Sequence, residues 1–409
     1  MLIKIERWTA FAENAALICL WGTLASISFS NSLFEIFSSI LMGLAILLVL
    51  ARRDWSLFRN KWFYASATLI LIDTLTIFFS IDPWSSARGA FRVLRCVMLA
   101  FFTVYTLNTK EKFHKTYHFF VWMIFLTCLD AVCQGLLGFE LVLQRRMTPY
   151  TEAIGRVTGP FHHANDFAAF LSLAFFLGLA AFSSSEKFDS KKKYLYAAIS
   201  FLSLICLLWT YARGAWIAVI ISLVVYALFY RNKKILFSIL GVFLIVIFLA
   251  PDSLKQRVHS LGNWNDGTMR ERRILWGESL GMIQQKPLLG FGSNTYSQVE
   301  PHFKKKGTKT DFQYAHNGYL QIAAETGLIG LGSFLVMLLF YFSGTLPDFL
   351  RERRTELGAC GLAVNAGIFS FLIHSATDTN LQSLRLIGLL WLIMGMGFAA
   401  SRLLKKNSA

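Results

Sequence analysis

His316 and Asn317 directly precede a long apolar run of the chain. A histidine at the N-terminus of a helix feels the positive end of the helix dipole, which disfavours the imidazolium and leaves a neutral ring that can accept a proton. A general base needs this state; a histidine that bonds a carbonyl or caps the helix is the alternative. Glu325 lies further along the same run, where an ionisable group is costly to bury and is therefore a candidate functional group.

Arginines form a second group of candidates. Arg213 lies in a turn between two apolar runs that is too short to carry it far into water. Its guanidinium either snorkels towards lipid headgroups or holds a phosphate by paired hydrogen bonds. Arg272 and Arg273 belong to a charge run before Trp276, which is usually a solvated surface, and only one or two of its members would face a cleft.

Arg88, Arg92 and Arg95 recur at a spacing that places them on one helical face. Snorkelling explains Arg88 easily but Arg95 poorly, because Arg95 lies on the order of 10 Å deeper along the helix. The stripe predicts either the cationic wall of a polar cleft or pairing with an acid such as Asp73 or Asp130.

Asp378 lies in the last turn between apolar runs, near His374 and Asn380. Its carboxylate could orient a histidine or bind a sugar hydroxyl, and it could equally cap the helix that follows. His162 and His163 are adjacent and would point different ways on a helix, so no metal site is predicted. Phosphate-loop, HExxH and GxSxG motifs do not occur, so ATP hydrolysis and metalloprotease chemistry are not expected, and no cofactor is predicted.

Composition defines the elements that must position these groups. The 409 residues are 55% hydrophobic and only 16% charged, where a soluble protein carries about a quarter. Apolar runs of roughly the ~20 residues that cross a bilayer recur throughout, which excludes a water-soluble enzyme. The sequence predicts an all-α polytopic membrane protein with about twelve transmembrane helices, near 13–30, 33–50, 62–81, 87–107, 116–138, 164–182, 194–210, 214–230, 235–250, 317–342, 357–376 and 382–401.

The connections predict how the chain is organised. All seven prolines fall between the predicted spans, as helix-breaking residues should. We divide the chain into spans one to nine (1–250), a large external loop (251–315) and the last three spans (316–409). Within the loop, 273–286 predicts an amphipathic helix whose apolar face carries Trp276, Leu280 and Ile283.

Charge predicts the orientation. Alternate connections and both termini carry 22 of the 40 Lys and Arg residues, so this face is expected to be cytoplasmic and the long loop external. The net charge of +16 therefore reflects topology, and a nucleic-acid partner is not expected.

An ordered series of motifs resembles the bacterial O-antigen ligase family. The resemblance is firm over about 155–332, and the large loop between the ninth and tenth spans matches too. Its motifs are WTYARGAW at 209–216, RRILW at 272–276, KPLLGFG at 286–292, HNGYL at 316–320 and ETGLIGL at 325–331.

This resemblance implies a glycosyltransferase of the GT-C type in the bacterial inner membrane with a periplasmic active site, and the charge pattern predicts that both termini are cytoplasmic. Its partners would be membrane lipids, a donor glycan on undecaprenyl diphosphate and an acceptor lipid A-core oligosaccharide, with inversion and without metal or nucleotide. Arg213 and Arg272 match arginines expected to bind the diphosphate, and His316 matches the histidine expected to activate the acceptor. Whether Arg272 or its neighbour Arg273 points inward is left open.

Other positions are predicted to bind substrate or support the site. Asp378 matches an acidic residue of the last periplasmic turn more weakly, and Arg156 and Asn165 resemble an Arg…Gly…Asn pattern after the fifth span. The predicted substrate-binding residues are Arg273, Arg88, Arg92, Arg95, Arg156, Asn165, Asn317, Glu325 and Asp378. O-antigen polymerases, protein oligosaccharyltransferases and small-anion transporters belong to the same superfamily and remain alternatives.

Overall fold

The structure is a computed structural model. It describes residues 2–151, 154–183, 190–230, 252–259, 267–304 and 314–408, with isolated positions 237, 241, 244 and 248. The long helices are α1 (Leu2–Phe29), α2 (Asn31–Arg52), α3 (Lys61–Thr76), α4 (Pro83–Thr106), α5 (Lys110–Leu137), α6 (Ala164–Ser183), α7 (Ser190–Trp209), α8 (Arg213–Tyr230), α11 (Gly267–Gln285), α13 (Gly318–Arg351), α14 (Glu356–His374) and α15 (Leu384–Ser408).

Shorter elements lie in the connections. They are the helices α10 (Asp252–His259) and α12 (Tyr296–Val299), the 3₁₀ turns η1 (Ser56–Phe58), η2 (Ile77–Phe79) and η4 (Glu300–Phe303), and the strands β1 (Thr148–Thr151) and β2 (Ile154–Arg156). The two strands pair antiparallel in a small hairpin ahead of α6.

The helices confirm a multi-pass, all-α membrane protein. Within the described residues, nine helices are long and apolar enough to cross a bilayer, and two shorter apolar helices occupy 164–180 and 193–209. These eleven correspond to eleven of the predicted spans. The remaining predicted span, 235–250, lies almost entirely outside the described residues.

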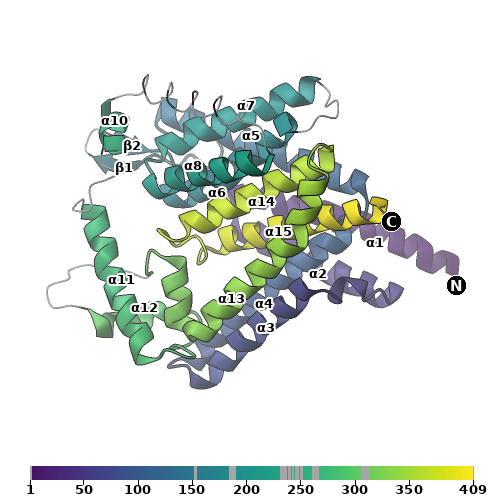
Figure 1. Cartoon of the computed structure of the whole chain (residues 1–409), viewed down its shortest axis with the longest axis horizontal. Coiled ribbons are helices and arrows are strands. Elements are labelled where there is room, and N and C mark those ends of the chain that lie inside the picture. Colours follow the sequence, from purple (N-terminus) through teal and green to yellow (C-terminus); the bar gives the residue numbers. More distant parts are fainter. Residues whose placement is uncertain are drawn as a thin grey trace.

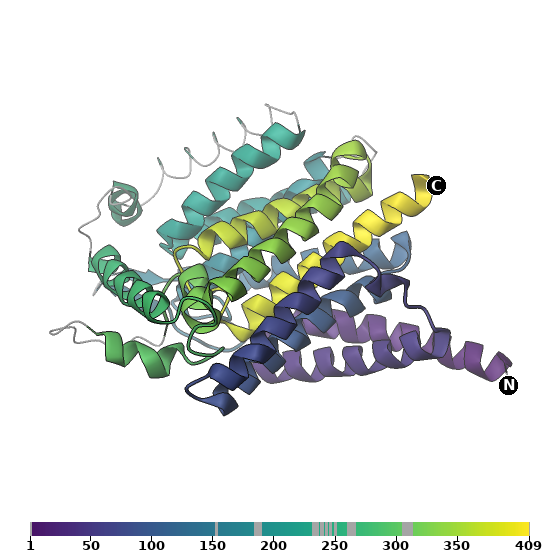
Figure 2. The same cartoon turned by 60° about the horizontal axis from the view of Figure 1, so that its bottom comes forward.

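The two ends of the chain lie together, opposite the helices of the long connection. Figures 1 and 2 show the N- and C-termini at one end of the bundle, and α10, α11 and α12 at the other. This arrangement agrees with the prediction that both termini share one face and the long loop occupies the other.

Two local predictions are wrong. Pro347 lies inside α13 and not in a connection. The helix continues past it because the following residues are buried. Asp348, for example, accepts a hydrogen bond from Ser401 and forms an ion pair with Lys405 at 3.1 Å. This packing compensates for the backbone hydrogen bond that a proline removes.

The amphipathic helix is longer than predicted and turned differently. α11 begins at Gly267, and its buried side carries Leu275, Ser279 and Met282. Leu280 is 49% exposed. Ser279 can be buried because its hydroxyl bonds the carbonyl of Leu275 and the hydroxyl of Tyr296, so the buried face of α11 is not its most apolar one.

Candidate functional site

Asp378 lies at the centre of the predicted site, in the turn between α14 and α15. The carboxylate is buried. Its Oδ2 accepts hydrogen bonds from Asn165 Nδ2 at 2.5 Å and from Arg272 Nη2 at 3.1 Å, and Nδ1 of His316 lies 3.5 Å from its Oδ1. Four segments far apart in the sequence therefore meet at one side chain, which does not cap α15.

The surroundings of Asp378 keep it charged. Burial raises the pKa of the carboxyl, but the contact with His316 and the positive charge of Arg272 outweigh burial and hold the pKa well below its ordinary value of 3.8. A buried carboxylate that accepts a charge-assisted hydrogen bond from Arg272 and lies beside His316 can hold both side chains in place.

His316 has a constrained backbone. Its φ is +47°, a left-handed conformation that is uncommon for residues other than glycine and is found more often at functional sites. The next residue, Asn317, caps α13 by accepting hydrogen bonds from the backbone N–H groups of Tyr319 and Leu320. The indole N–H of Trp276 lies 3.4 Å from the carbonyl of His316. The imidazole is thus presented from a fixed helix start, and Asn317 has a structural role.

Arg156 ties Asp378 to the turn that carries Arg213. Its Nε donates to the carbonyl of Thr210 at 2.7 Å, and its Nη2 donates to Asn165 Oδ1 at 2.5 Å. Asn165 then donates to Asp378. Arg156 and Asn165 therefore link the start of α8 to the centre of the site.

Arg213 itself begins α8, beside the Asp378 turn. The preceding turn contains Tyr211 in a left-handed conformation, with φ of +54°. At Gly214 a Cβ atom would lie 2.2 Å from Thr377 Oγ1 and 3.3 Å from His374. The absence of a side chain at Gly214 permits this close approach, which brings the start of α8 against the segment that ends in Asp378.

Arg272 faces the site and Arg273 does not. Arg272 lies three residues before Leu275, on the buried side of α11, and its side chain is 14% exposed. Arg273 is rotated by about 100° around the helix and is exposed. The geometry thus separates two neighbours that sequence left equivalent.

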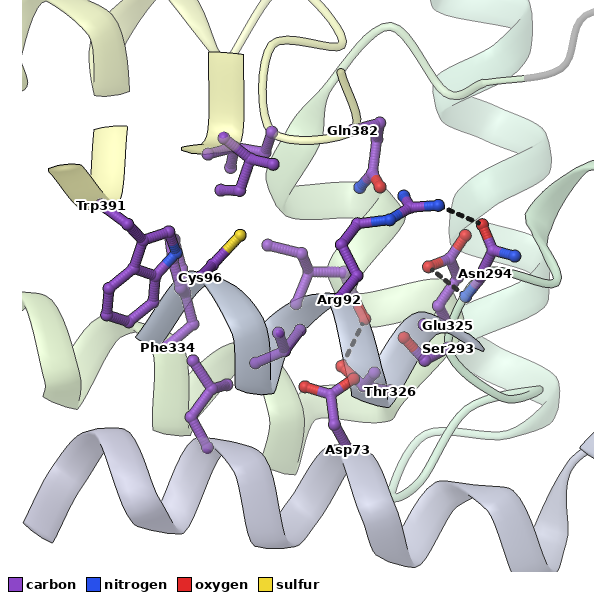
Figure 3. A pocket seen from close by; sticks show the side chains of 16 residues that line it. Asp73, Arg92, Cys96, Ser293, Asn294, Glu325, Thr326, Phe334, Gln382 and Trp391 are labelled. Atoms are coloured by element: carbon purple, nitrogen blue, oxygen red, sulfur yellow. Dashed lines mark hydrogen bonds between the residues drawn. The ribbon is translucent and has the colours of Figure 1, made fainter. Parts of the chain in front are cut away.

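The three arginines of α4 have different partners. Arg88 donates to Ser85 Oγ at 3.0 Å, one turn earlier on its own helix. Arg95 pairs with an acid, as one of the two alternatives predicted, but the partner is Glu35 on α2 at 3.3 Å and neither Asp73 nor Asp130. Arg92 lines a pocket between helices (Figure 3). Helical spacing predicts a shared face but not which neighbouring helix each side chain meets.

Glu325 lies away from the Asp378 cluster. Its carboxylate accepts hydrogen bonds from the backbone N–H groups of Asn294 and Tyr296, at 2.9 and 3.3 Å, and from Gln321 at 3.1 Å. It therefore fastens the 290–296 segment to α13. Asn294, with φ of +61°, and Gln382 join Arg92 at the pocket. Sequence reasoning missed both, because an isolated amide in a connection carries no pattern.

The cluster offers base and cation chemistry. In the ranges that the structure describes, no three His, Cys, Asp or Glu side chains converge as metal ligands. His316 supplies a nitrogen that can accept a proton, and Arg272 supplies a guanidinium suited to an anionic oxygen.

Comparisons with known proteins agree with the motifs. Residues 198–335 match the family model described as O-antigen ligase. The chain is 26% identical over 316 residues to the O-antigen ligase of Salmonella typhimurium, covering 72% of this chain and 73% of that protein. It is 30% identical over 111 residues to the exopolysaccharide production protein ExoQ of Rhizobium meliloti, a quarter of each chain.

A third relative is an uncharacterised protein of Haemophilus influenzae, 24% identical over 222 residues, which are 46% of this chain and 55% of that protein. The family model spans the segment from α7 into α13, which includes Arg213, Arg272 and His316. The chain is thus similar to the O-antigen ligase family over this segment and to one O-antigen ligase over most of its length, which indicates a glycosyltransferase-type membrane enzyme.

Proposed function

We propose that this protein is an O-antigen ligase that transfers a glycan from undecaprenyl diphosphate to a lipid A-core oligosaccharide. One observation carries the proposal: Asp378 contacts both His316 and Arg272, which unites a base and a cation at a single carboxylate. The Salmonella typhimurium relative, an O-antigen ligase aligned over most of both chains, supports the same activity.

In this proposal Arg213 and Arg272 bind the donor diphosphate. A guanidinium presents paired N–H donors in a plane that fits two phosphate oxygens. As the bond between the anomeric carbon and the diphosphate breaks, its electron pair stays on the leaving oxygen, and the two arginines stabilise the developing negative charge. Arg273, Arg88 and Arg95 have no part in this step, since their side chains are exposed or engaged elsewhere.

His316 acts as the base. Nδ1 is turned to Asp378, so the neutral ring carries its proton on Nδ1 and Nε2 is the nitrogen that accepts one. Nε2 takes the proton of an acceptor hydroxyl while the hydroxyl oxygen attacks the anomeric carbon from the face opposite the diphosphate, so the configuration inverts. A positioned base of this kind contributes about 10²- to 10⁴-fold. Asp378 is a positioning residue that holds the ring and Arg272 together.

The location follows from the charge pattern. The terminal face, richer in Lys and Arg, is proposed to be cytoplasmic, and the Asp378 cluster then lies at the periplasmic face of the inner membrane. Lipid-linked donor and acceptor would both reach the site from the outer leaflet.

A polymerase is the second candidate, because it would use the same donor and the same residues with another acceptor. The match to the exopolysaccharide production protein of Rhizobium meliloti supports this second candidate, although that match covers only a quarter of each chain. Acceptor identity, and not the His316 and Arg272 geometry, separates the two.

Deleting the gene in its native host separates these activities. A ligase predicts bare core-lipid A together with long polymer accumulating on the undecaprenyl carrier. Core that carries at most one repeat unit indicates a polymerase. Unchanged lipopolysaccharide and carrier pools would overturn both assignments and favour a protein-glycosylating enzyme or a transporter.

Complementation tests the base. Asparagine tolerates the left-handed backbone of His316 but cannot act as a base at neutral pH. His316→Asn should therefore abolish glycan transfer while undecaprenyl diphosphate still binds. Near-normal transfer by this variant would remove His316 from the mechanism. Arg213→Lys keeps the charge but loses the paired donors, so donor affinity should fall.

A further inference from the structure

A mostly apolar pocket with one polar end lies between α3, α4, α13 and α15, next to the turn that carries Asp378. Figure 3 shows its two ends: Arg92, Asn294 and Gln382 gather at one, and Cys96, Phe334 and Trp391 surround the other. The cavity has a volume of about 90 Å³. A single water needs on the order of 10–15 Å³, so the pocket admits a phosphate or carboxylate group but not a whole oligosaccharide.

Arg92 has unused hydrogen-bond donors in this pocket. In the part of the chain that the structure describes, its one hydrogen bond is a long one of 3.4 Å from Nη2 to Asn294 Oδ1. A guanidinium carries five N–H donors. Arg92 lies nine residues after the start of α4 at Pro83, roughly 14 Å along the helix, where an arginine needs an anion or water.

The two acids of the pocket do not pair with Arg92. Glu325 is occupied by the backbone N–H groups of Asn294 and Tyr296 and by Gln321. Asp73, on α3, is bound by the hydroxyl of Ser293. In the described ranges neither carboxylate comes within 4.0 Å of the guanidinium; Glu325 feels the charge of Arg92 but accepts none of its hydrogen bonds, so the donors of Arg92 stay available to a ligand.

The pocket and the cluster share two elements. The turn after α14 carries Asp378 in the cluster and Gln382 in the pocket. Ile322, a pocket residue on α13, lies four residues after the start of the helix at Gly318, roughly 6 Å along its axis, and His316 lies just before that start. This turn is fixed to the start of α13 by the hydrogen bond from the Gly318 N–H to the Ser375 carbonyl at 2.8 Å. A molecule held at Arg92 can therefore extend to the imidazole of His316.

We propose that Arg92, with Asn294 and Gln382, binds a phosphate or carboxylate of the acceptor lipid and so places its hydroxyl before His316. This inference rests on the proposed function, since it divides the two substrates between two arginine sites. The donor diphosphate is assigned to Arg213 and Arg272, and the second substrate of a transferase needs its own anchor next to the base. Arg92 is the cation of the α4 stripe that faces this space.

Steady-state kinetics of the full-length protein in detergent test the assignment. Lipid A-core is varied while undecaprenyl-diphosphate-linked glycan is saturating, and then the two are exchanged. Arg92→Gln should raise the acceptor KM at least tenfold and change the donor KM less than twofold, and Arg92→Lys should restore part of the loss. Gln382→Leu, which changes no charge, should raise the acceptor KM about threefold. This variant tests the assignment if Arg92→Gln does not fold.

Arg88→Gln and Arg95→Gln are matched controls on the same helix. Their arginines bond Ser85 and Glu35 outside the pocket, so both variants should keep the wild-type acceptor KM. Dephosphorylated lipid A-core identifies the anion. If wild type and Arg92→Gln have the same KM for this acceptor, Arg92 binds a phosphate. If their KM values still differ, Arg92 binds a carboxylate.

Other outcomes overturn the assignment. A rise in the donor KM would place the donor in the pocket, and a fall in kcat with unchanged KM would make Arg92 purely structural. Wild-type KM values in both Arg92 variants would also refute it while the proposed function stands. If wild-type protein transfers no glycan from undecaprenyl diphosphate to lipid A-core, the proposed function fails, and that result is distinct from a failure at Arg92.

Discussion

The side-chain amide of Asn165 donates a hydrogen bond of 2.5 Å to the carboxylate of Asp378, a residue 213 positions later in the chain. The carbonyl of the same amide accepts from Arg156. Two charged partners, Arg156 and Asp378, therefore orient the side-chain amide of Asn165. Asn165 joins the start of α6 to the turn that also contacts His316 and Arg272. The arrangement predicts that catalysis depends on a residue that need not touch either substrate.

Replacing Asn165 with alanine should slow transfer. A hydrogen bond to a charged group contributes about 1.5–3 kcal/mol, and about 1.36 kcal/mol corresponds to tenfold in rate. We expect kcat/KM for glycan transfer to fall about 10- to 100-fold in Asn165→Ala, measured with purified protein. Asn14→Ala, an exposed position on α1, is the control. A wild-type kcat/KM in Asn165→Ala would show that Asp378 is held without it.

Arg272 and Arg273 provide a test between neighbours. Arg272 donates to Asp378 and is largely buried, whereas Arg273 is exposed. Arg272→Ala should therefore reduce transfer at least 100-fold, because it removes a cation from the diphosphate site and a partner from a buried carboxylate. Arg273→Ala should stay within twofold of wild type. Equal losses in the two variants would contradict the orientation of α11, and the comparison needs only one assay at matched protein level.

Sequence patterns predict much of this site because its parts are local. A turn before an apolar run locates Arg213, and a helix start locates His316. Neither requires knowledge of distant contacts, and the order of the motifs carries the family resemblance. Span boundaries are predictable for the same reason, since each depends on a continuous run of apolar residues.

Partners across the fold are not predictable in this way. Arg95 meets Glu35, 60 positions earlier, and Glu325 holds backbone N–H groups of a loop some 30 positions before it. Both contacts depend on how helices pack after they form. The periodicity of a single sequence predicts which face of a helix is buried but not which neighbouring helix that face meets. The buried side of α11 is another example, because Ser279 is buried through its bond to Tyr296 and not through its hydrophobicity.

Gly327 is a point where the backbone excludes any other residue. It interrupts α13 with φ of 72° and ψ of −179°, and a Cβ atom there would lie 2.0 Å from the carbonyl oxygen of Leu288. The next N–H, of Leu328, donates to the carbonyl of Pro287 at 2.8 Å. The break therefore docks the 287–294 segment, including Asn294, onto α13.

Gly327→Ala should lower the midpoint of thermal unfolding in detergent by several degrees. The left-handed backbone alone costs a residue with a side chain on the order of 1–3 kcal/mol, and the clash with Leu288 adds to it. Gly332→Ala, five residues on in the same helix, is the matched control because a Cβ atom there meets nothing within 4 Å. It should be neutral or slightly stabilising, by about 0.5–1 kcal/mol. Equal unfolding midpoints for the two variants would contradict the non-helical backbone at Gly327.

Glu140 should make the stability of the protein depend on pH. It is fully buried in the connection after α5, and burial raises its pKa from 4.5 to about 8, with the neighbouring carboxyl of Asp130 adding to the rise. Since the folded pKa exceeds the unfolded one, this group's contribution to stability is complete below about pH 4.5 and is lost as the pH rises through about 8. The thermal unfolding midpoint should therefore fall between pH 5 and 9, and Glu140→Gln should flatten that slope. Glu111→Gln, which removes an exposed partner of Lys115, should keep the wild-type slope; an unchanged slope in Glu140→Gln would assign the pH dependence to another group.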